Sequence, residues 1–307
     1  MSEPTIRALA LDIDGTLIGS DKRVPAFTRS EIARVAEEYG AHVFLVTARP
    51  PSSARLIAQE LGASVSYATF SGALVEARGA GTSTGTDGAY GDSLATLRAV
   101  AIPAPTVARA GECAADLPVH VGVYGRDTWA VSDMGHWGLR EARGTGVWPT
   151  DVGRPAVERA IGENETFKIM FRGEAEPLNE LERRLVPLAD EMFVHRSGNV
   201  LECTSVHARK FSAVEALCAH FGIGTDQVLA FGDTTADREM LESVGAGVLM
   251  GNAQPGTATG VEVTLSNDED GVGMMLRRDF PTARPFDPWS LGFGERSSQP
   301  QRVDSGA

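Results

Sequence analysis

The sequence is poor in lysine and cysteine and lacks any long apolar run. Only three of its 28 basic residues are lysine, at positions 22, 168 and 210. Its three cysteines have no metal-ligand spacing and cannot all pair, which fits a reducing compartment. No apolar stretch approaches the roughly 18 residues of a membrane span, and the N-terminal apolar run is too short for a signal peptide. We therefore expect a cytoplasmic protein with no membrane partner.

Positive charge is in short supply as a whole. With 41 acidic against 28 basic residues, the formal net charge is −13. A surface this acidic repels nucleic-acid backbones, so we expect no nucleic-acid partner. The glycine patterns that bind nucleotides are missing too, since no GxGxxG follows the first predicted strand and GxxxxGK followed by Ser or Thr occurs nowhere. A nucleotide-binding doubly wound domain is therefore disfavoured, and an anionic ligand must meet local positive charge.

Strands and helices alternate at both ends of the chain. Residues 6–12 and 42–46 have the apolar runs of strands, and each is followed by apolar side chains at helical spacing. The same alternation resumes at Lys210. Such a pattern predicts an α/β fold in which a parallel sheet has helices on both faces.

The middle of the chain has a different texture. Residues 120–133 predict a hairpin that turns at residues 125–127, and residues 167–171 and 192–197 predict two further strands. From residue 280 the chain is rich in Pro, Arg, Ser and Gly and has few apolar residues. The predicted division is a core of residues 1–79 and 192–280, an inserted α+β domain of residues 80–191 and a disordered tail of residues 281–307.

Acidic side chains follow two of the predicted strands. Asp12 and Asp14 come at the end of the first strand, and Asp233 and Asp237 follow the strand at 228–231. Because neighbouring parallel strands end at the same edge of a sheet, four carboxylates would converge there. Like charges this close are costly unless a hard cation such as Mg²⁺ is bound. One such pair is common in turns, whereas two pairs placed after strands indicate a metal site.

These residues resemble a known family. The stretches that match the four motifs of the haloacid dehalogenase superfamily of phosphotransferases are Asp12-Ile13-Asp14-Gly15-Thr16, Thr47, Lys210 and Gly232-Asp233 with Asp237. The insert lies between the second and third motifs, which resembles the C2 cap type of the Cof-like sugar phosphatase branch. Further matches to that branch are Thr47-Ala48-Arg49-Pro50, Ser71-Gly72-Ala73, Leu201-Glu202 and Gly251-Asn252-Ala253. The resemblance covers almost all of residues 5–278 and implies a Rossmann-like parallel sheet core with an inserted α+β cap domain.

The resemblance implies a covalent mechanism. Asp12 would attack the phosphoryl group and form an aspartyl-phosphate that water then hydrolyses. Asp14 would protonate the leaving alcohol and then deprotonate the water. Thr47 and Lys210 would hold the phosphoryl oxygens. The second aspartate points to a hydrolase or a mutase, because the dehalogenases of the superfamily lack it.

The resemblance also implies Mg²⁺ as the cofactor. The Asp12 carboxylate, the Asp14 backbone carbonyl and Asp233 would bind the ion. Asp237 would lie in its outer shell or pair with Lys210.

Four positions depart from the pattern of the branch. The branch usually reads GDxxND, and here Thr234 stands where a polar amide is common and Ala236 where asparagine is expected. Ser71 replaces an asparagine, and Phe211 replaces a glycine. None of the four removes an acid, a lysine or a hydroxyl that the core chemistry needs, so they bear on substrate identity and metal affinity.

Side chains beside the motifs and on the insert are the candidates for binding the substrate. Arg49 opens a helix after a strand and therefore points toward the predicted site, whereas Lys168 lies in a strand and faces either inward or solvent. The predicted substrate-binding residues are Arg49, Ser71, Gly72, Lys168 and Asn252.

Two enzymatic functions and one non-enzymatic function are compatible with these motifs. The first is a Mg²⁺-dependent phosphatase of a small phosphorylated sugar, amino sugar or cyclitol. The alternative is a phosphomannomutase-like phosphoryl transferase acting on a hexose phosphate, which returns the phosphate instead of releasing it. A non-catalytic binding protein would be expected to have lost Asp12 or Asp14, and both are present. The predicted partner is a small phosphate ester, and neither its identity nor the oligomeric state follows from the sequence.

Overall fold

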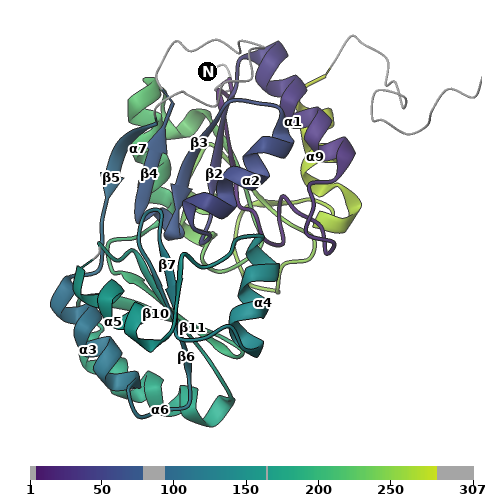
Figure 1. Ribbon diagram of the computed structural model, residues 1–307. Helices are drawn as coiled ribbons and strands as arrows, with labels where there is room; N and C mark the ends of the chain where they lie inside the picture. Colours follow the sequence, from purple (N-terminus) through teal and green to yellow (C-terminus); the bar gives the residue numbers. More distant parts are fainter. Residues whose placement is uncertain (1–4, 79–93, 164, 282–307) are drawn as a thin grey trace, which may run out of the picture.

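The computed structural model describes residues 5–78, 94–163 and 165–281, and it contains two sheets (Figure 1). The larger sheet has eight strands in the order β14-β13-β12-β1-β2-β3-β4-β5. Its strands are β1 (Ala8–Leu11), β2 (His42–Val46), β3 (Val65–Thr69), β4 (Leu74–Ala77), β5 (Ala95–Ala99), β12 (Val228–Gly232), β13 (Ala246–Leu249) and β14 (Glu262–Val263). From β14 to β3 the strands run parallel, and β4 and β5 are antiparallel to their neighbours. The predicted parallel α/β core is confirmed.

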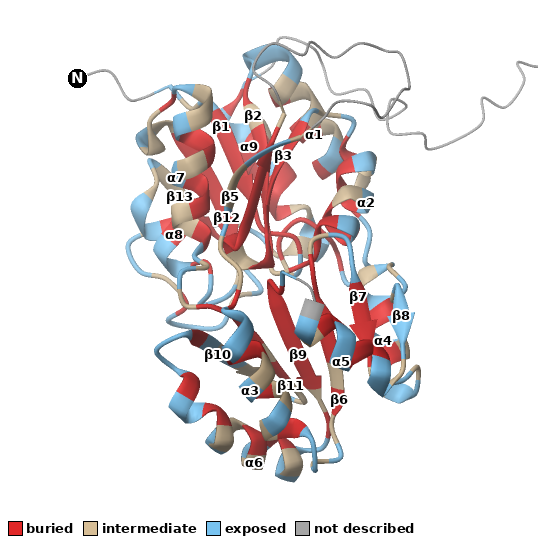
Figure 2. Ribbon diagram, turned by 60° about the vertical axis from the view of Figure 1, so that its left-hand side comes forward, coloured by how far each residue is buried: buried red, intermediate tan, exposed pale blue. Residues whose placement is uncertain are grey.

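Helices cover both faces of this core sheet because its central strands are apolar on both sides. On β1, Leu9 and Leu11 pack against one set of helices, while Ala8 and Ala10 pack against the other. The first set is α1 (Ala26–Tyr39), α2 (Pro51–Leu61) and α9 (Gly271–Asp279), and the second is α7 (Lys210–Phe221) and α8 (Arg238–Ser243). Figure 2 shows the strands of the core sheet as buried along most of their length.

The second sheet has six strands in the order β10-β11-β9-β6-β7-β8. These are β6 (His120–Tyr124), β7 (Trp129–Val131), β8 (Asp151–Val152), β9 (Lys168–Arg172), β10 (Met192–Ser197) and β11 (Val200–Ser205). The predicted hairpin at residues 120–133 is present as the antiparallel pair β6 and β7. One face is covered by α3 (Ala104–Ala114), α5 (Arg154–Glu163) and α6 (Ala175–Leu185). We call residues 102–163 and 165–205, which form this unit, the cap.

The strand pairing moves both boundaries of the predicted division. Residues 192–205, which were assigned to the core, form β10 and β11, and β11 pairs with β9 of the cap. At the other boundary β5, at Ala95–Ala99, pairs with β4 and so extends the core sheet. The turn at Gly198 folds β10 back on β11, and the pairing of β11 with β9 places both strands in the second sheet. Residues 79–93, and residues 282–307 of the predicted tail, lie outside the described residues.

The face of the cap sheet opposite α3, α5 and α6 looks toward the core. The helix α4 (His136–Thr145) covers part of it, and an apolar cluster that includes Phe70 and Leu74 of the core covers another part. Within that cluster the rings of Phe70 and Phe167 stack with centroids 5.6 Å apart. The two units are thus packed together next to the carboxyl ends of the core strands. Across the described residues, no helix combines the length and the apolar character needed to span a membrane.

Candidate active site

The predicted nucleophile lies where β1 ends. Leu11 pairs with Phe231 of β12, so Asp12 follows directly beside the end of that neighbouring strand. Lys210, the first residue of α7, places its Nζ 2.9 Å from Asp12 Oδ1 and 2.6 Å from Asp237 Oδ1. All three side chains are buried. The structure therefore brings together three of the residues that the motifs singled out from distant parts of the chain.

The loop after β12 holds Asp237 in a fixed position. Its Oδ2 accepts hydrogen bonds from the backbone N–H of Asp233 at 3.3 Å, from the backbone N–H of Thr234 at 3.0 Å and from the Thr234 hydroxyl at 2.9 Å. Its other oxygen faces Lys210. Thr234, noted above as a departure from the family pattern, thus takes part in orienting the carboxylate. Ala236 is exposed, and nothing in the structure explains this substitution.

Three carboxylates in this region could hold a metal ion. One oxygen each from Asp12, Asp233 and Asp237 lies within 4.8 Å of the others. Burial, with repulsion from neighbouring carboxylates, raises the pKa of Asp12 from 3.8 to about 7 even though Lys210 opposes the shift, and raises that of Asp233 to about 6. When neighbouring carboxyl groups have raised pKa values, a hard cation that prefers oxygen ligands stabilises their ionised forms. The donor set would fit Mg²⁺, for which Asp12 and Asp233 are the candidate carboxylate ligands.

Gly15 allows this cluster to be compact. Its φ of +74° lies in the left-handed region, and a Cβ there would fall 2.2 Å from Asp233 Oδ2. Thr16, the next residue, donates its hydroxyl to Asp233 Oδ1 at 3.1 Å. The turn after β1 therefore positions the carboxylate that follows β12.

We expect Mg²⁺ to stabilise the protein more at high pH than at low pH. In the folded metal-free protein, Asp12 and Asp233 have pKa values raised above the ordinary 3.8. The stability that these two carboxyl groups contribute is fully present below their unfolded pKa of 3.8. It is lost as the pH rises through about 6 for Asp233 and about 7 for Asp12. Since Mg²⁺ binds the ionised carboxylates, the Tm increase on adding Mg²⁺ should grow between about pH 5.5 and about pH 8.

Thermal unfolding with excess Mg²⁺ or with EDTA, at several pH values across that range, measures this effect. The variant Asp233→Asn should lose the Mg²⁺-dependent part of Tm, while Asp190→Asn, on the exposed surface of the cap, should keep it. A Tm increase that is the same at every pH would contradict the placement of the metal on these two carboxylates.

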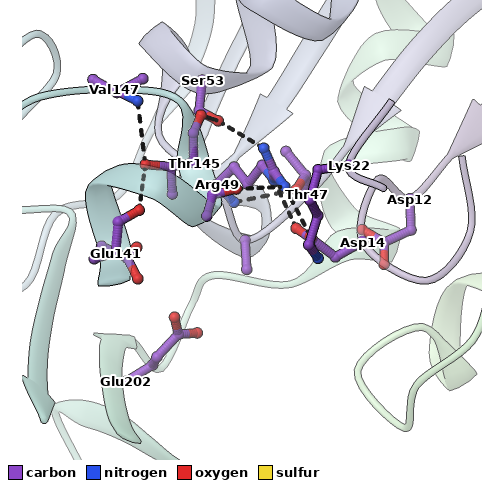
Figure 3. A network of polar contacts seen from close by, with 12 residues as sticks. Asp12, Asp14, Lys22, Thr47, Arg49, Ser53, Glu141, Thr145, Val147 and Glu202 are labelled. Atoms are coloured by element: carbon purple, nitrogen blue, oxygen red, sulfur yellow. Dashed lines mark hydrogen bonds and ion pairs between the residues drawn. The ribbon is translucent and has the colours of Figure 1, made fainter. Parts of the chain in front are cut away.

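Asp14 is not one of the three clustered carboxylates and is held by Arg49 (Figure 3). Arg49 Nε and Nη2 donate to the two carboxylate oxygens at 2.6 and 2.8 Å, and Lys22 Nζ lies 3.3 Å from Oδ1. Burial alone would raise the pKa of Asp14, but Arg49 and then Lys22 outweigh it and lower that pKa below its ordinary value. Arg49, predicted to bind substrate, is thus already paired with the second motif aspartate.

The predicted residues Thr47, Ser71 and Gly72 meet in the turn after β2 and β3. Thr47 is buried, its Oγ1 accepts the Arg49 backbone N–H at 3.1 Å, and its carbonyl accepts the Ser71 N–H at 2.8 Å. Ser71 has a φ of 58° and Gly72 a φ of +93°. A Cβ at Gly72 would not fit, because it would lie 2.4 Å from the Arg209 carbonyl oxygen. Gly72 therefore lets this turn lie against the residue that precedes Lys210.

The other two candidates for substrate binding are also engaged with the protein. Lys168 is buried, and its Nζ lies 3.2 Å from the Ala48 carbonyl, 3.3 Å from Glu202 Oε1 and 4.8 Å from the centre of the Tyr124 ring. Asn252 donates its Nδ2 to the Gly15 carbonyl at 2.8 Å, and its Oδ1 accepts from a neighbouring backbone N–H. Lys168 thus reaches the site from the cap, whereas Asn252 supports the loop that carries Asp12.

Sequence reasoning missed two side chains at this site. Lys22 contacts Asp14, and its rarity in an arginine-rich chain was the available signal. Ser53 accepts a hydrogen bond from Arg49 Nη1 at 3.0 Å, and its position one helical turn after Arg49 was the available signal.

A family profile described as haloacid dehalogenase-like hydrolase matches residues 9–276. The chain belongs to the haloacid dehalogenase-like hydrolases. A Haemophilus influenzae protein named as a phosphatase is 40% identical over 123 residues, which are 39% of this hydrolase and 47% of that protein. The 5-amino-6-(5-phospho-D-ribitylamino)uracil phosphatase YitU of Bacillus subtilis is 26% identical over 279 residues, covering 89% of this chain and 97% of that one.

A solved structure titled as a HAD subclass IIB sugar phosphatase superposes on this hydrolase with a TM-score of 0.69. It is 22% identical, and the match covers 89% of this chain and 98% of that one, so it supports the fold. The predicted superfamily and the prediction of a phosphatase-type enzyme are confirmed by the family match and the phosphatase relatives.

Proposed function

We propose that this hydrolase is a Mg²⁺-dependent phosphatase that acts on a small phosphorylated metabolite such as a sugar, amino sugar or cyclitol phosphate. The observation that carries the proposal is the buried contact of Asp12 with Lys210 at the end of β1, with Asp233 and Asp237 beside it. Asp12 is the carboxylate of this group that follows β1 directly. The names of the Bacillus subtilis relative and of the sugar phosphatase structure support a small polar substrate.

In the proposed reaction, a carboxylate oxygen of Asp12 forms a bond to phosphorus as the bond to the leaving oxygen breaks. Asp14 gives a proton to that oxygen, and it later takes one from the water that hydrolyses the aspartyl-phosphate. Arg49 favours the ionised form of Asp14, which serves this second step and opposes the first, for which Asp14 must hold a proton. Lys210 and Thr47 would bind the non-bridging phosphoryl oxygens. When bound, Mg²⁺ would neutralise the carboxylates and the phosphoryl charge.

The cap supplies the remaining contacts in this proposal. Lys168 and Glu202 form an ion pair on the face of the cap sheet that lies next to the Thr47 segment. A charged pair there suits a leaving group with several hydroxyls better than an apolar one. We also propose a cytoplasmic location, which the three free cysteines support.

The test is a screen of the purified protein against a panel of phosphorylated metabolites, with Mg²⁺ and with EDTA, in which inorganic phosphate is measured. We expect release from sugar phosphates and related polyol phosphates, and none in EDTA. Interconversion of hexose phosphate isomers without phosphate release would overturn the phosphatase proposal in favour of the mutase. Activity on none of the panel, with the metal bound, would overturn both.

A further inference from the structure

The segment just after Thr47 carries several hydrogen bonds between the core and the cap. Lys168 of the cap donates to the Ala48 carbonyl at 3.2 Å. Arg49 Nη2 donates to the Gly144 carbonyl at 3.2 Å, and the Ser53 hydroxyl donates to the Thr145 carbonyl at 2.7 Å (Figure 3). The core residues of these contacts all lie within six residues of Thr47. The cap therefore docks on the core next to the proposed reaction centre.

The two acceptors from the cap are the carbonyls at the end of a helix. The helix α4 ends at Thr145, and Gly146 follows with a φ of 71° and donates its N–H to the Ala142 carbonyl. The last carbonyls of a helix have no partner within it and lie at the negative end of its dipole. A guanidinium and a hydroxyl from the core fill this need, so these two carbonyls have core side chains as partners only while the cap is docked.

Arg49 connects this helix end to Asp14. Its Nε and Nη2 donate hydrogen bonds to the two carboxylate oxygens of Asp14. Nη2 also donates to the Gly144 carbonyl, and Nη1 donates to the Ser53 hydroxyl. Arg49 is only 7% exposed. One planar guanidinium therefore binds the second motif aspartate, a core serine and the cap at once, which the compact ammonium of a lysine could not do.

We propose that Arg49 is a positioning residue that, together with Ser53, latches α4 of the cap onto the core and thereby fixes the Asp14 carboxylate. In the docked state the carbonyl of Gly144 and the hydroxyl of Ser53 hold the guanidinium flat against Asp14. When the cap moves away, Arg49 loses the Gly144 carbonyl and Ser53 loses the Thr145 carbonyl, and only the bond between Arg49 and Ser53 within the core supports the guanidinium beside Asp14. The role of Asp14 in this inference rests on the proposed function, whereas the contacts that form the latch do not depend on it.

The latch is tested without substrate by measuring the distance between cap and core. Nitroxide labels on Glu37→Cys of α1 and Val186→Cys of the cap, both exposed positions, report this distance by pulsed electron paramagnetic resonance in a Cys113→Ser background. We expect Ser53→Ala and Arg49→Lys to move population from the docked distance to longer ones. The matched control is Ser52→Ala, an exposed serine one residue earlier, which should leave the distribution unchanged. Distributions identical to that of the parent in both latch variants would overturn the proposal.

The positioning role is tested by splitting kcat from KM. Ser53→Ala removes the bond to Thr145 but leaves the Arg49–Asp14 pair, and we expect kcat to fall about 3- to 10-fold, as for one net hydrogen bond, with KM within about twofold. Arg49→Lys keeps the positive charge, but we expect its kcat to fall as well. A rise in KM for Arg49→Lys with no effect of Ser53→Ala would instead identify Arg49 as a substrate-binding group and overturn the latch. If the parent protein releases no phosphate, the proposed function fails, while the label distances still decide whether the latch exists.

Discussion

Asp12→Asn is expected to lower phosphate release by roughly 10³-fold or more while leaving the fold intact. The amide has the same shape but cannot attack phosphorus, and it brings no charge to the metal. The fold should survive because Lys210 keeps its 2.6 Å ion pair with Asp237. Burial also raises the pKa of Asp12, so removing this carboxylate should leave Tm in EDTA unchanged or higher at neutral pH.

Steady-state kinetics on the best substrate of the screen, with Tm measured in EDTA, checks this prediction. Asp190→Asn, the same exchange on the exposed cap surface, serves as the control and should retain full activity. If Asp12→Asn kept activity within tenfold of the parent, the assignment of the nucleophile would be wrong.

Lys210→Arg should also lose most of the activity, although it keeps the positive charge. Lys210 is 5% exposed, and its Nζ fits between Asp12 and Asp237 at 2.9 and 2.6 Å. Although burial would lower the pKa of Lys210, the two carboxylates raise it above its ordinary value, so the ammonium is charged throughout the working range. A guanidinium needs a wider, flat slot that this buried site does not offer, and we expect kcat/KM to fall about 10²-fold.

The matched control is the reverse exchange at the preceding residue. Arg209 has an exposed side chain 3.5 Å from Glu239, so Arg209→Lys should retain kcat/KM within about twofold. Lys22→Arg is unsuitable as a control because Lys22 contacts Asp14. Retention of more than about half of the parent kcat/KM by Lys210→Arg would show that the lysine does not hold the phosphoryl group.

The parallel core and the convergence of the motif residues could be predicted because both depend on local patterns. A strand that is apolar on both faces and ends in Asp12 specifies its place in a parallel sheet, and the same holds for β12 and Asp233. The end of the insert could not be placed correctly from the sequence, because whether residues 192–205 join one sheet or the other depends on a partner strand, β9, that precedes them by about 30 residues.

The partners of the side chains were also beyond the sequence. Arg49 was expected to point toward the predicted site and to bind substrate, whereas its contacts with Asp14 and with the end of α4 follow from how the turn after β2 and the cap are placed. The side chain of Asn252 donates a hydrogen bond to the Gly15 carbonyl because a loop distant in sequence returns to the first motif. Long-range contacts of this kind leave no periodic signal in the chain.

The scarcity of lysine has a consequence for chemical labelling. All three lysines lie among the described residues and within or beside the site, and only Lys22 is exposed, with 55% of its side chain accessible. An amine-directed reagent that modifies lysine therefore meets one accessible ε-amino group, and that group is the neighbour of Asp14. Acylation of lysine in this protein would report on the surroundings of Asp14 and very little on the rest of its surface.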